Sequence, residues 1–361
     1  MNHAYGNRCP SLPLFPTTVR KKLTIAALIM ACLILLAAGT GYWIVFSPNT
    51  PSYEGELRVK LPPGSQLETV ADSLESAGVL ATRKSFTWMA KLTGWGDQIK
   101  AGHYTFKAGV SNYDLLDVLR RGLQTPIHLT LPPGSRPEVV SAVLAREMYF
   151  TADDFARALC DTALARELGT DTTHLFGYMM PETYFFYWLN DAPTVVRKIK
   201  ESFDTFYKKE TKDHPAPLGL TPDEVISMAG IVEWESYHLP EKPTVAGVYL
   251  NRLRDGWALQ ADPTIQYAIL QSEGKKRRLF FRDYELKHSY NTYLYRGLPP
   301  GPINNPSPSS IRAVLQPEAH QYYYFVARGD GTHLFSRTLS EHRRNAQAYY
   351  ALMREKRKAQ E

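Results

Sequence analysis

The longest apolar run of the chain covers residues 23–46 and contains no charged residue. About 20 apolar residues, each adding about 1.5 Å of helix, are enough to cross the hydrocarbon core of a bilayer. The basic residues Arg20, Lys21 and Lys22 stand directly before the run, and such residues tend to stay in the cytoplasm. The pattern predicts a transmembrane helix over residues 23–46, a cytoplasmic tail over residues 1–22 and an exported remainder.

A cleaved signal peptide is the alternative for this segment. Its apolar region is about 7–15 residues long and is followed by small residues at a cleavage site. Ala37 and Ala38 are small, but the run is longer than such a region and ends in the bulky Trp43 and Phe46. The pattern therefore favours an uncleaved single-pass anchor in the inner (plasma) membrane.

Two segments of the exported part share one pattern of apolar and polar positions, at an offset of 70 residues. Leu61-Pro62-Pro63-Gly64-Ser65 recurs as Leu131-Pro132-Pro133-Gly134-Ser135. In each copy a short alternating strand leads into the Pro-Pro-Gly turn, and an amphipathic helix follows. The serine that ends each copy and a glutamate three residues later, Glu68 or Glu138, have the spacing of a capping box. We therefore predict two related strand–turn–helix units.

The rest of the first half completes two small modules. Residues 101–106 alternate as a strand does, and residues 112–121 have the spacing of a helix, so residues 53–125 are predicted to form a small α/β module. Residues 126–215 are predicted to form a second, more helical α/β module. Its aromatic stretch at residues 184–188 is interpreted as core, with a sugar-stacking wall as the alternative.

A capped helix is predicted after the break at residues 214–219. Thr221, Pro222 and Glu224 combine an N-cap, a proline at the first helical position and the glutamate of a capping box. Glu233 borders the apolar stripe of this helix, and a carboxyl group beside apolar groups has the raised pKa that a general acid needs. Glu235 points roughly 200° away around the helix. Helix geometry alone does not choose between the two, and a solvated surface glutamate is the commoner role for either.

Two turn-rich polar stretches follow, over residues 255–264 and 290–306. They combine Asn, Tyr, Thr and Gln side chains with backbone made rigid by proline. Long loops of this kind in a compact domain are more often functional than idle. Their composition suits the binding of a neutral, hydroxyl-rich polymer.

Composition narrows the classes of partner. The chain has 42 Lys and Arg against 36 Asp and Glu, for a net charge of +6. Outside a membrane this charge suits phospholipid headgroups and cell-wall polymers that carry carboxylates. We expect no nucleic-acid partner, because the basic residues are scattered and the chain is exported.

The positions of the cysteines and histidines indicate whether disulfide bonds or metal sites are expected. Of three cysteines, only Cys160 lies in the predicted exported part, so this part is expected to fold without an internal disulfide. We expect no metal site and no cofactor, since the later histidines lack a recognisable ligand spacing. These histidines are His288, His320, His333 and His342.

Seven motifs in one order, spread over some 120 residues, resemble those of the MltG (YceG-like) endolytic murein transglycosylases. The upstream Leu-x-Pro-Pro-Gly units, with Ala101-Gly102-x-Tyr104, match the LysM-like module of that family. The seven motifs are Ile231-Val232-Glu233-x-Glu235, Asn251-Arg252-Leu253, Leu259-Gln260-x-Asp262-Pro263-Thr264, Tyr290-Asn291-Thr292-Tyr293, Gly297-Leu298-Pro299-Pro300-Gly301-Pro302-Ile303, Tyr324-Phe325-Val326-Ala327 and His333-x-Phe335-Ser336.

The resemblance implies an α+β protein with an N-terminal transmembrane helix, a LysM-like small α/β module and a mixed α/β catalytic domain. The LysM-like module corresponds to residues 53–125 and is joined through the second α/β module, residues 126–215. The catalytic YceG-like domain is expected over residues 216–350, and a basic tail over residues 351–361.

The resemblance also implies a single-carboxylate lytic reaction. Its acid corresponds to the first glutamate of the motif, Glu233, which would protonate the bridging oxygen between N-acetylmuramic acid and N-acetylglucosamine. The same group would then take the proton of the muramoyl C6 hydroxyl and close a 1,6-anhydro ring, ending the elongation of a nascent strand. The side chains expected to hold the glycan are Gln260, Asp262, Tyr290, Asn291, Thr292, Tyr293 and Asn305.

Three alternatives stay open. A hydrolysing muramidase would use Glu235 or Asp262 as a second carboxylate. Both of these residues could instead be structural partners of Arg252. A non-enzymatic scaffold would bind peptidoglycan strands for the cell-wall synthesis machinery. The expected partners in every case are peptidoglycan, the membrane and the peptidoglycan synthases of elongation or division.

Overall fold

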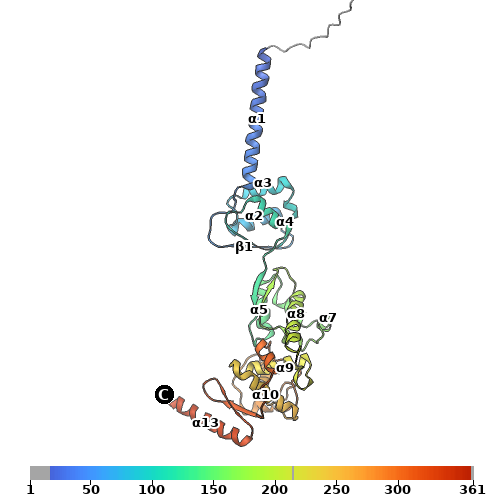
Figure 1. Ribbon diagram of the computed structural model, residues 1–361, viewed down its shortest axis with the longest axis vertical. Helices are drawn as coiled ribbons and strands as arrows, with labels where there is room; N and C mark the ends of the chain where they lie inside the picture. Colours follow the sequence, from blue (N-terminus) through green and yellow to red (C-terminus); the bar gives the residue numbers. More distant parts are fainter. Residues whose placement is uncertain (1–16, 214, 359–361) are drawn as a thin grey trace, which may run out of the picture. The chain divides into compact units, whose positions relative to one another are not determined.

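The computed structural model describes residues 17–213 and 215–358 as a mixed α/β protein that is mostly helical (Figure 1). Its strands within these residues form three two-stranded antiparallel sheets. The chain divides into two compact units, residues 1–125 and residues 126–361. Each unit has its own hydrophobic core.

Helix α1 (Thr17–Phe46) contains the apolar run. Its side chains lie in the open, as Leu33 at 63% and Leu36 at 71% exposure illustrate. Among the described residues it is the one helix long and apolar enough to cross a membrane. It begins before the predicted residue 23, because Arg20 to Lys22 continue the helix. By length and composition α1 is compatible with a single-pass membrane anchor.

The first unit packs helices against one small sheet. Strand β1 (Leu57–Leu61) pairs antiparallel with β2 (Gly102–Phe106), so that Val59 lies opposite Tyr104. Helices α2 (Leu67–Ser76), α3 (Arg83–Thr93) and α4 (Asn112–Arg121), with the short turn η1 (Gly96–Gln98), complete the unit. Strand β1 buries Val59 and Leu61 in the core, and β2, which is buried at four of its five positions, contributes Tyr104 and Phe106. The predicted strand and the helix over residues 112–121 are confirmed.

The predicted capping boxes of the two Pro-Pro-Gly units are wrong. Helix α2 begins one residue later, with Gln66 as an N-cap that makes no side-chain bond. The Ser65 hydroxyl instead donates to the Pro62 carbonyl at 2.8 Å, because it closes the turn in which Gly64 has a φ of 77°. Helix α5 (Pro137–Glu147) likewise starts after Arg136 without a side-chain cap.

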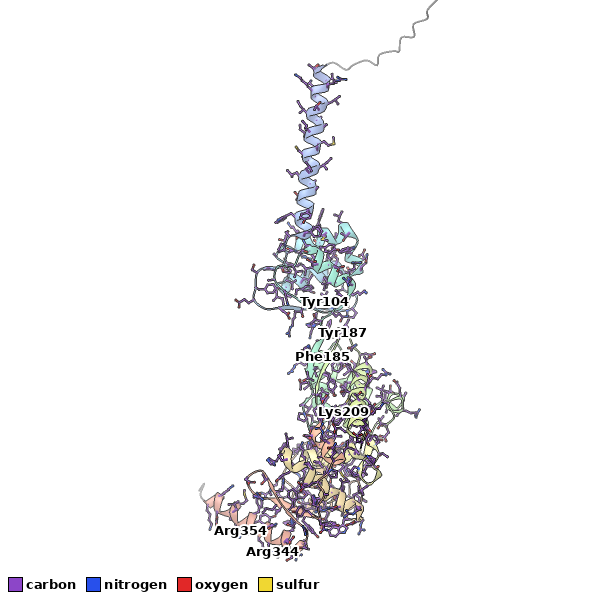
Figure 2. All side chains as sticks on the ribbon, in the orientation of Figure 1. Tyr104, Phe185, Tyr187, Lys209, Arg344 and Arg354 are labelled. Carbon is purple, nitrogen blue, oxygen red and sulfur yellow. The ribbon has the colours of Figure 1, made fainter. Side chains whose placement is uncertain are left out.

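The second unit begins with strand β3 (Ile127–Thr130), which pairs antiparallel with β4 (Thr183–Phe186). Helix α5 packs on β3, α6 (Ala152–Leu159) packs against α5, α7 (Thr162–Glu167) and α8 (Ala192–Glu210), and the turn η2 (Leu175–Tyr178) packs against α8. In the aromatic stretch, Tyr184, Phe186 and Trp188 are buried, as predicted for core residues. Phe185 and Tyr187, labelled in Figure 2, are half exposed because strand side chains alternate.

Helix α9 (Pro222–Glu235) lies at the centre of the remaining chain. Its predicted capping box is confirmed, since Thr221 and Glu224 bond reciprocally. Every residue from Val225 to Glu233 is buried, so the helix is enclosed on all sides rather than along one stripe. It packs against α10 (Lys242–Arg254), α11 (Asp262–Glu273) and α12 (Pro308–Leu315). The short turns η3 (Pro217–Gly219), η4 (Leu239–Glu241) and η5 (Phe281–Glu285) lie between these helices along the chain.

A hairpin and a long helix end the chain. Strand β5 (Tyr324–Ala327) pairs with β6 (His333–Ser336), and α13 (Leu339–Lys358) packs on this hairpin. The predicted basic tail is therefore helical up to Lys358, and residues 359–361 lie outside the described residues. One hydrophobic core runs from Leu129 to Leu315. It joins the two parts that were predicted as separate domains on either side of residue 215.

Candidate active site

Glu233 is buried, with 7% of its surface exposed, and one oxygen of its carboxylate accepts several hydrogen bonds. One oxygen, Oε2, accepts from the backbone N–H of Ser307 at 3.0 Å, from the Ser310 hydroxyl at 2.6 Å and from the Ser307 hydroxyl. Lys242 Nζ lies 3.1 Å from the same oxygen. Glu233 therefore links helix α9 to the starts of α10 and α12.

These contacts decide the charge of Glu233. Burial acts to raise the pKa of its carboxyl, but hydrogen bonds from Ser307 and Ser310 and the charge of Lys242 outweigh burial, so the pKa is lowered. The N-terminus of α12 also favours a negative charge at this place. The reasoning that apolar neighbours give Glu233 a raised pKa is wrong, because its polar contacts come from sequence-distant segments.

Glu235, the last residue of α9, has the opposite environment. It is only partly exposed, and it lies near Tyr249 and Arg252 of α10 and near Asp262 of α11. Burial, and next the charge of Asp262, raise its pKa to about 8, while Arg252 and Tyr249 act against them. Glu235 therefore keeps its proton at neutral pH, as a general acid requires.

Asp262 and Tyr293 form the second polar pair of this region. The Tyr293 hydroxyl donates to Asp262 Oδ1 at 2.7 Å, and the ring of Tyr284 lies 4.7 Å from that of Tyr293. Burial and the Asp262 charge raise the pKa of Tyr293, so the phenol stays a neutral donor. Both predicted residues are thus brought close to Glu235, whose charge also acts on Tyr293.

Gln260 has a strained backbone beside this pair. Its φ of 49° lies in the left-handed region that side chains other than glycine rarely adopt. The loop is held there by Thr292, whose carbonyl accepts from Gln260 N at 3.0 Å and whose hydroxyl accepts from Ala261 N at 3.0 Å. Strain maintained by the surrounding structure is typical of functional sites. The Gln260 side chain is exposed.

The loops that carry Gln260 and Tyr293 border an open, polar cleft. Gln260 and Tyr293 line a cleft of about 580 Å³. Its aromatic and polar lining suits a sugar chain, because rings stack on sugar faces while side-chain donors and acceptors meet hydroxyl groups. The full lining is Asp255, Gly256, Trp257, Ala258, Gln260, Tyr293, Leu294 and Arg296. Sequence reasoning selected both loops of this lining but not Trp257 or Arg296.

Five of the seven predicted glycan-binding residues do not line this cleft. One of the five, Asp262, is linked to the cleft through its hydrogen bond from Tyr293, and for the other four the prediction needs correction. Asn291, Thr292 and Asn305 are at most 2% exposed, and Tyr290 is 8% exposed. Asn291 Nδ2 donates to two carbonyls of its own loop, at 3.0 Å and 2.8 Å. Asn305 Nδ2 donates to Pro132 O at 3.1 Å and Met179 O at 2.9 Å. The donor groups of these buried amides are already bonded to backbone carbonyls, so they stabilise the loops and are not available to a substrate.

Comparison with known proteins identifies the family of the chain. The sequence pattern of the YceG-like family matches residues 59–348. The chain belongs to the YceG-like family. It is 29% identical to the endolytic murein transglycosylase of Bacillus subtilis, over 83% of this chain and 86% of that protein. It is 26% identical to the enzyme of the same name from Streptococcus pneumoniae D39, over 90% of this chain and 64% of that protein.

A solved structure shares the fold. The crystal structure of a yceG-like protein from Listeria monocytogenes superposes with a TM-score of 0.54 at 25% sequence identity. The match covers 81% of this chain and 99% of that one.

In this YceG-like chain Arg252 organises the loops around Glu235. Its guanidinium donates to Tyr323 O at 2.8 Å and to Leu259 O. In the part of the chain that the structure describes, it forms no ion pair within 4.0 Å with Glu235 or Asp262. Its charge nevertheless lowers the pKa of Glu235. The alternative of a simple structural pairing with Arg252 is therefore not what the geometry favours.

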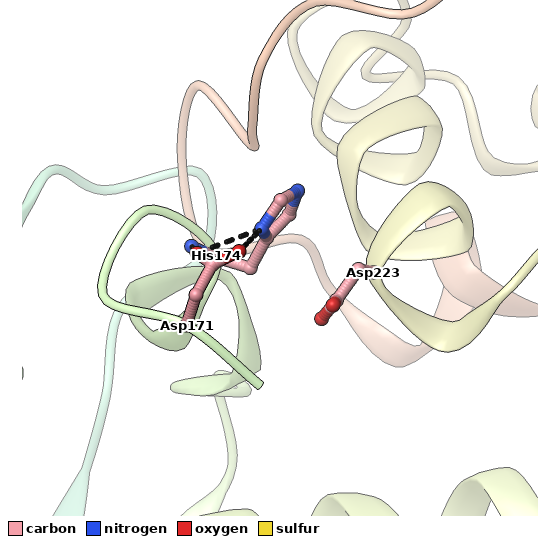
Figure 3. Close-up of side chains that lie close together, drawn as sticks. All are labelled: Asp171, His174 and Asp223. Atoms are coloured by element: carbon pink, nitrogen blue, oxygen red, sulfur yellow. Dashed lines mark hydrogen bonds and ion pairs between the residues drawn. The ribbon is translucent and has the colours of Figure 1, made fainter. Parts of the chain in front are cut away.

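A second cluster of ionisable groups consists of Asp171, His174 and Asp223, none of which lines the cleft (Figure 3). His174 Nδ1 lies 2.9 Å from Asp171 Oδ1, and Asp223 Oδ1 accepts from the Thr170 hydroxyl at 2.7 Å. Sequence reasoning missed this cluster, because Asp223 is some 50 residues from the other two. Its polar atoms serve to attach the loop before η2 to the first turn of α9.

Proposed function

We propose that this chain is a membrane-anchored endolytic murein transglycosylase. It cleaves the bond between N-acetylmuramic acid and N-acetylglucosamine in nascent peptidoglycan strands and leaves 1,6-anhydro-muramoyl ends. Family membership and the names of the relatives support the class of reaction. The observation that carries the proposal is a carboxyl with a raised pKa, Glu235, which interacts with Asp262, the hydrogen-bond partner of Tyr293 in the lining of a polar and aromatic cleft.

We propose Glu235 as the acid, and the predicted Glu233, two residues away in the same motif, stays the alternative. The pKa of Glu233 is lowered, and Ser307, Ser310 and Lys242 all contact one oxygen, Oε2, of this mostly buried carboxyl, so Glu233 is expected to have no proton to give at neutral pH. Glu235 is protonated, partly exposed and two residues away in the same motif. Glu233 then has a positioning role, because it clamps α9 to α10 and α12 and so fixes where Glu235 points.

A pKa near 8 suits a group that must act first as an acid and then as a base. Glu235 donates its proton to the bridging oxygen, and the bond from this oxygen to the muramoyl C1 breaks. The substrate's own acetamido group stabilises the cationic centre. The Glu235 carboxylate, now facing the charge of Arg252, takes the proton of the C6 hydroxyl while that oxygen bonds to C1. No water is consumed, and Glu235 regains its proton.

The cleft residues would hold the strand. Gln260, Tyr293 and Asp262 provide an amide, a phenol donor and a carboxylate acceptor on one side of the site. Trp257, 43% exposed, offers an aromatic face and Arg296 a cation. A binding cleft of this kind, with a few fixed polar groups among apolar ones, is typical of ligand sites.

The first unit would tether and guide the enzyme. We propose that it is the LysM-like module and contacts glycan, with α1 as an uncleaved anchor whose N-terminus is cytoplasmic. A cleft of about 520 Å³ in this unit, lined by Gln66, Glu68 and Lys91 among others, supports a binding role. The enzyme would then act outside the inner membrane, where peptidoglycan synthases extrude new strands.

The test is digestion of uncrosslinked glycan strands by the purified full chain, followed by mass spectrometry of the products. We expect ends that are one water lighter than reducing ends. Reducing ends would show a hydrolysing muramidase, with Asp262 as second carboxylate. Intact strands in the presence of a folded protein would show a binding scaffold.

A further inference from the structure

A strongly basic segment follows helix α11. The segment from Glu273 to Asp283 has five basic residues, and its two end residues are its only acidic ones. Arg277 engages both acidic residues, Glu273 at 2.8 Å and Asp283 at 2.6 Å. Among the described residues, no carboxylate lies within 4.0 Å of the amino or guanidinium groups of Lys275, Lys276, Arg278 or Arg282. We call residues 275–282 the basic loop.

The basic loop contacts the helix that carries the acid. Lys276 Nζ lies 3.3 Å from the centre of the Trp234 ring, and Trp234 stands between Glu233 and Glu235. The indole is fixed from its other side, since Nε1 donates to Gly134 O at 2.8 Å. Arg136 adds a further positive charge close to Lys276. Its own partner, Glu138, is 3.9 Å away. Positive charge therefore exceeds negative charge at this place.

The loop also presents apolar surface to solvent. Phe281 is 94% exposed and Phe280 is 52% exposed. Exposed aromatic side chains flanked by unpaired cations are suited to a ligand with both carboxylates and aliphatic groups. Helix α11 separates the loop from Asp262 by 12 residues, about 18 Å of helix. A polymer substrate spans such a distance, whereas a single sugar does not.

We propose that the basic loop binds the carboxylates of the peptide side branches on the glycan strand. This inference rests on the proposed function and names the form of the substrate that the site prefers. Peptide branches of peptidoglycan carry free carboxylates and small aliphatic side chains, which match Lys275, Arg278 and the exposed Phe281. Charge-assisted hydrogen bonds from Lys and Arg to carboxylates are the stronger kind, and solvent-exposed ones weaken as salt is added.

The test compares two substrates with the full chain. Uncrosslinked strands are used with their peptide branches and after removal of the branches by an amidase. For the native chain we expect kcat/KM to be about tenfold higher on the branched strands, through a lower KM, and we expect the ratio to fall at high salt. In the variant Lys275→Gln/Lys276→Gln/Arg278→Gln the ratio should approach one.

A matched control removes the same charge elsewhere. The variant Arg343→Gln/Arg344→Gln/Arg354→Gln changes three exposed cations of α13, two of which are labelled in Figure 2, and should keep the native ratio. Because Lys276 also packs on Trp234, the variant Lys275→Gln/Arg278→Gln repeats the test with this contact intact.

Each result of the two-substrate experiment supports or overturns one specific claim. Equal cleavage of both strands by the native chain, or an unchanged ratio in the loop variants, overturns the inference while leaving the proposed function standing. Failure to cut either strand overturns the proposed function instead. A rate that follows the phosphatidylglycerol content of proteoliposomes equally for both strands would assign the loop to a lipid surface and also overturn the inference.

Discussion

Glu233 and Glu235 stand two residues apart on one helix and have opposite shifts in pKa. The pKa of Glu233 is lowered because four donor groups surround one of its oxygens. The pKa of Glu235 is raised to about 8 because burial and the charge of Asp262 outweigh Arg252 and Tyr249. Because the two carboxyl groups point in different directions around the same helix, they have different partners. The different partners give them different protonation states.

Replacement of Glu235 should remove catalysis without unfolding the protein. Glu235→Gln keeps the shape and removes the acidic proton, so we expect kcat to fall at least about a hundredfold. Product release from glycan strands measures this. The variant should also match or exceed the native chain in stability at pH 7, because keeping a carboxyl protonated above its usual pKa costs folding free energy. A fully active Glu235→Gln variant would contradict the assignment.

The rate should fall as pH rises through about 8. Glu235 acts as an acid, so the active form is protonated and is lost above its pKa. The charge of Asp262 raises this pKa, so Asp262→Asn should move the alkaline limb of the kcat profile to lower pH. Asp255→Asn is the matched control, since Asp255 lines the cleft but does not act on Glu235. A limb that stays in place in Asp262→Asn would contradict the electrostatic account.

Local signals predicted the elements well. The capping box at Thr221 and Glu224 is confirmed because both of its bonds lie within four residues. The same pattern failed at Ser65, where the hydroxyl closes a Pro-Pro-Gly turn. A capping box and a turn closure use the same residue type, and the sequence alone does not separate them.

The details of the site depended on contacts between distant segments. The hydrogen-bond donors to Glu233 are Ser307 and Ser310, more than 70 residues away. No local sequence pattern predicts these contacts. Asn291 and Asn305 were selected because polar residues in loops often bind ligands. They are buried instead, since irregular loops need side-chain amides to satisfy their own carbonyl groups. The predictions for Gln260 and Tyr293 stay predictions that the cleft lining supports, and Asp262 is connected to the cleft through Tyr293.

Loss of Glu233 should destabilise the protein. Glu233→Gln leaves the buried ammonium of Lys242 without a counter-charge, and breaking a buried ion pair in this way costs about 3–5 kcal/mol. Urea unfolding measures the loss. The double variant Glu233→Gln/Lys242→Met should recover part of it, because no unpaired charge is left.

The same carboxylate predicts a pH dependence of stability. The pKa of Glu233 in the folded chain is below its usual value of 4.5. Its contribution to the free energy of unfolding is therefore present above pH 4.5 and is lost as pH falls through the lower, folded pKa. The stability difference between the native chain and Glu233→Gln should shrink over this range. A difference that is independent of pH would show that Glu233 acts by packing alone.

Gln260 and Leu218 provide a matched test of strain and function. They are the two described residues other than glycine with a positive φ, 49° and 55°. A side chain in this conformation costs about 1–2 kcal/mol, whereas glycine adopts it freely but loses more entropy on folding. Replacement by glycine should therefore leave stability within about 1 kcal/mol of the native chain in both variants, as measured by urea unfolding.

Leu218→Gly should keep full activity, because its side chain lies outside the cleft. Gln260→Gly should raise KM, since it removes an amide that lines the cleft. Equal KM values in the two variants would show that Gln260 shapes the loop and does not bind the strand.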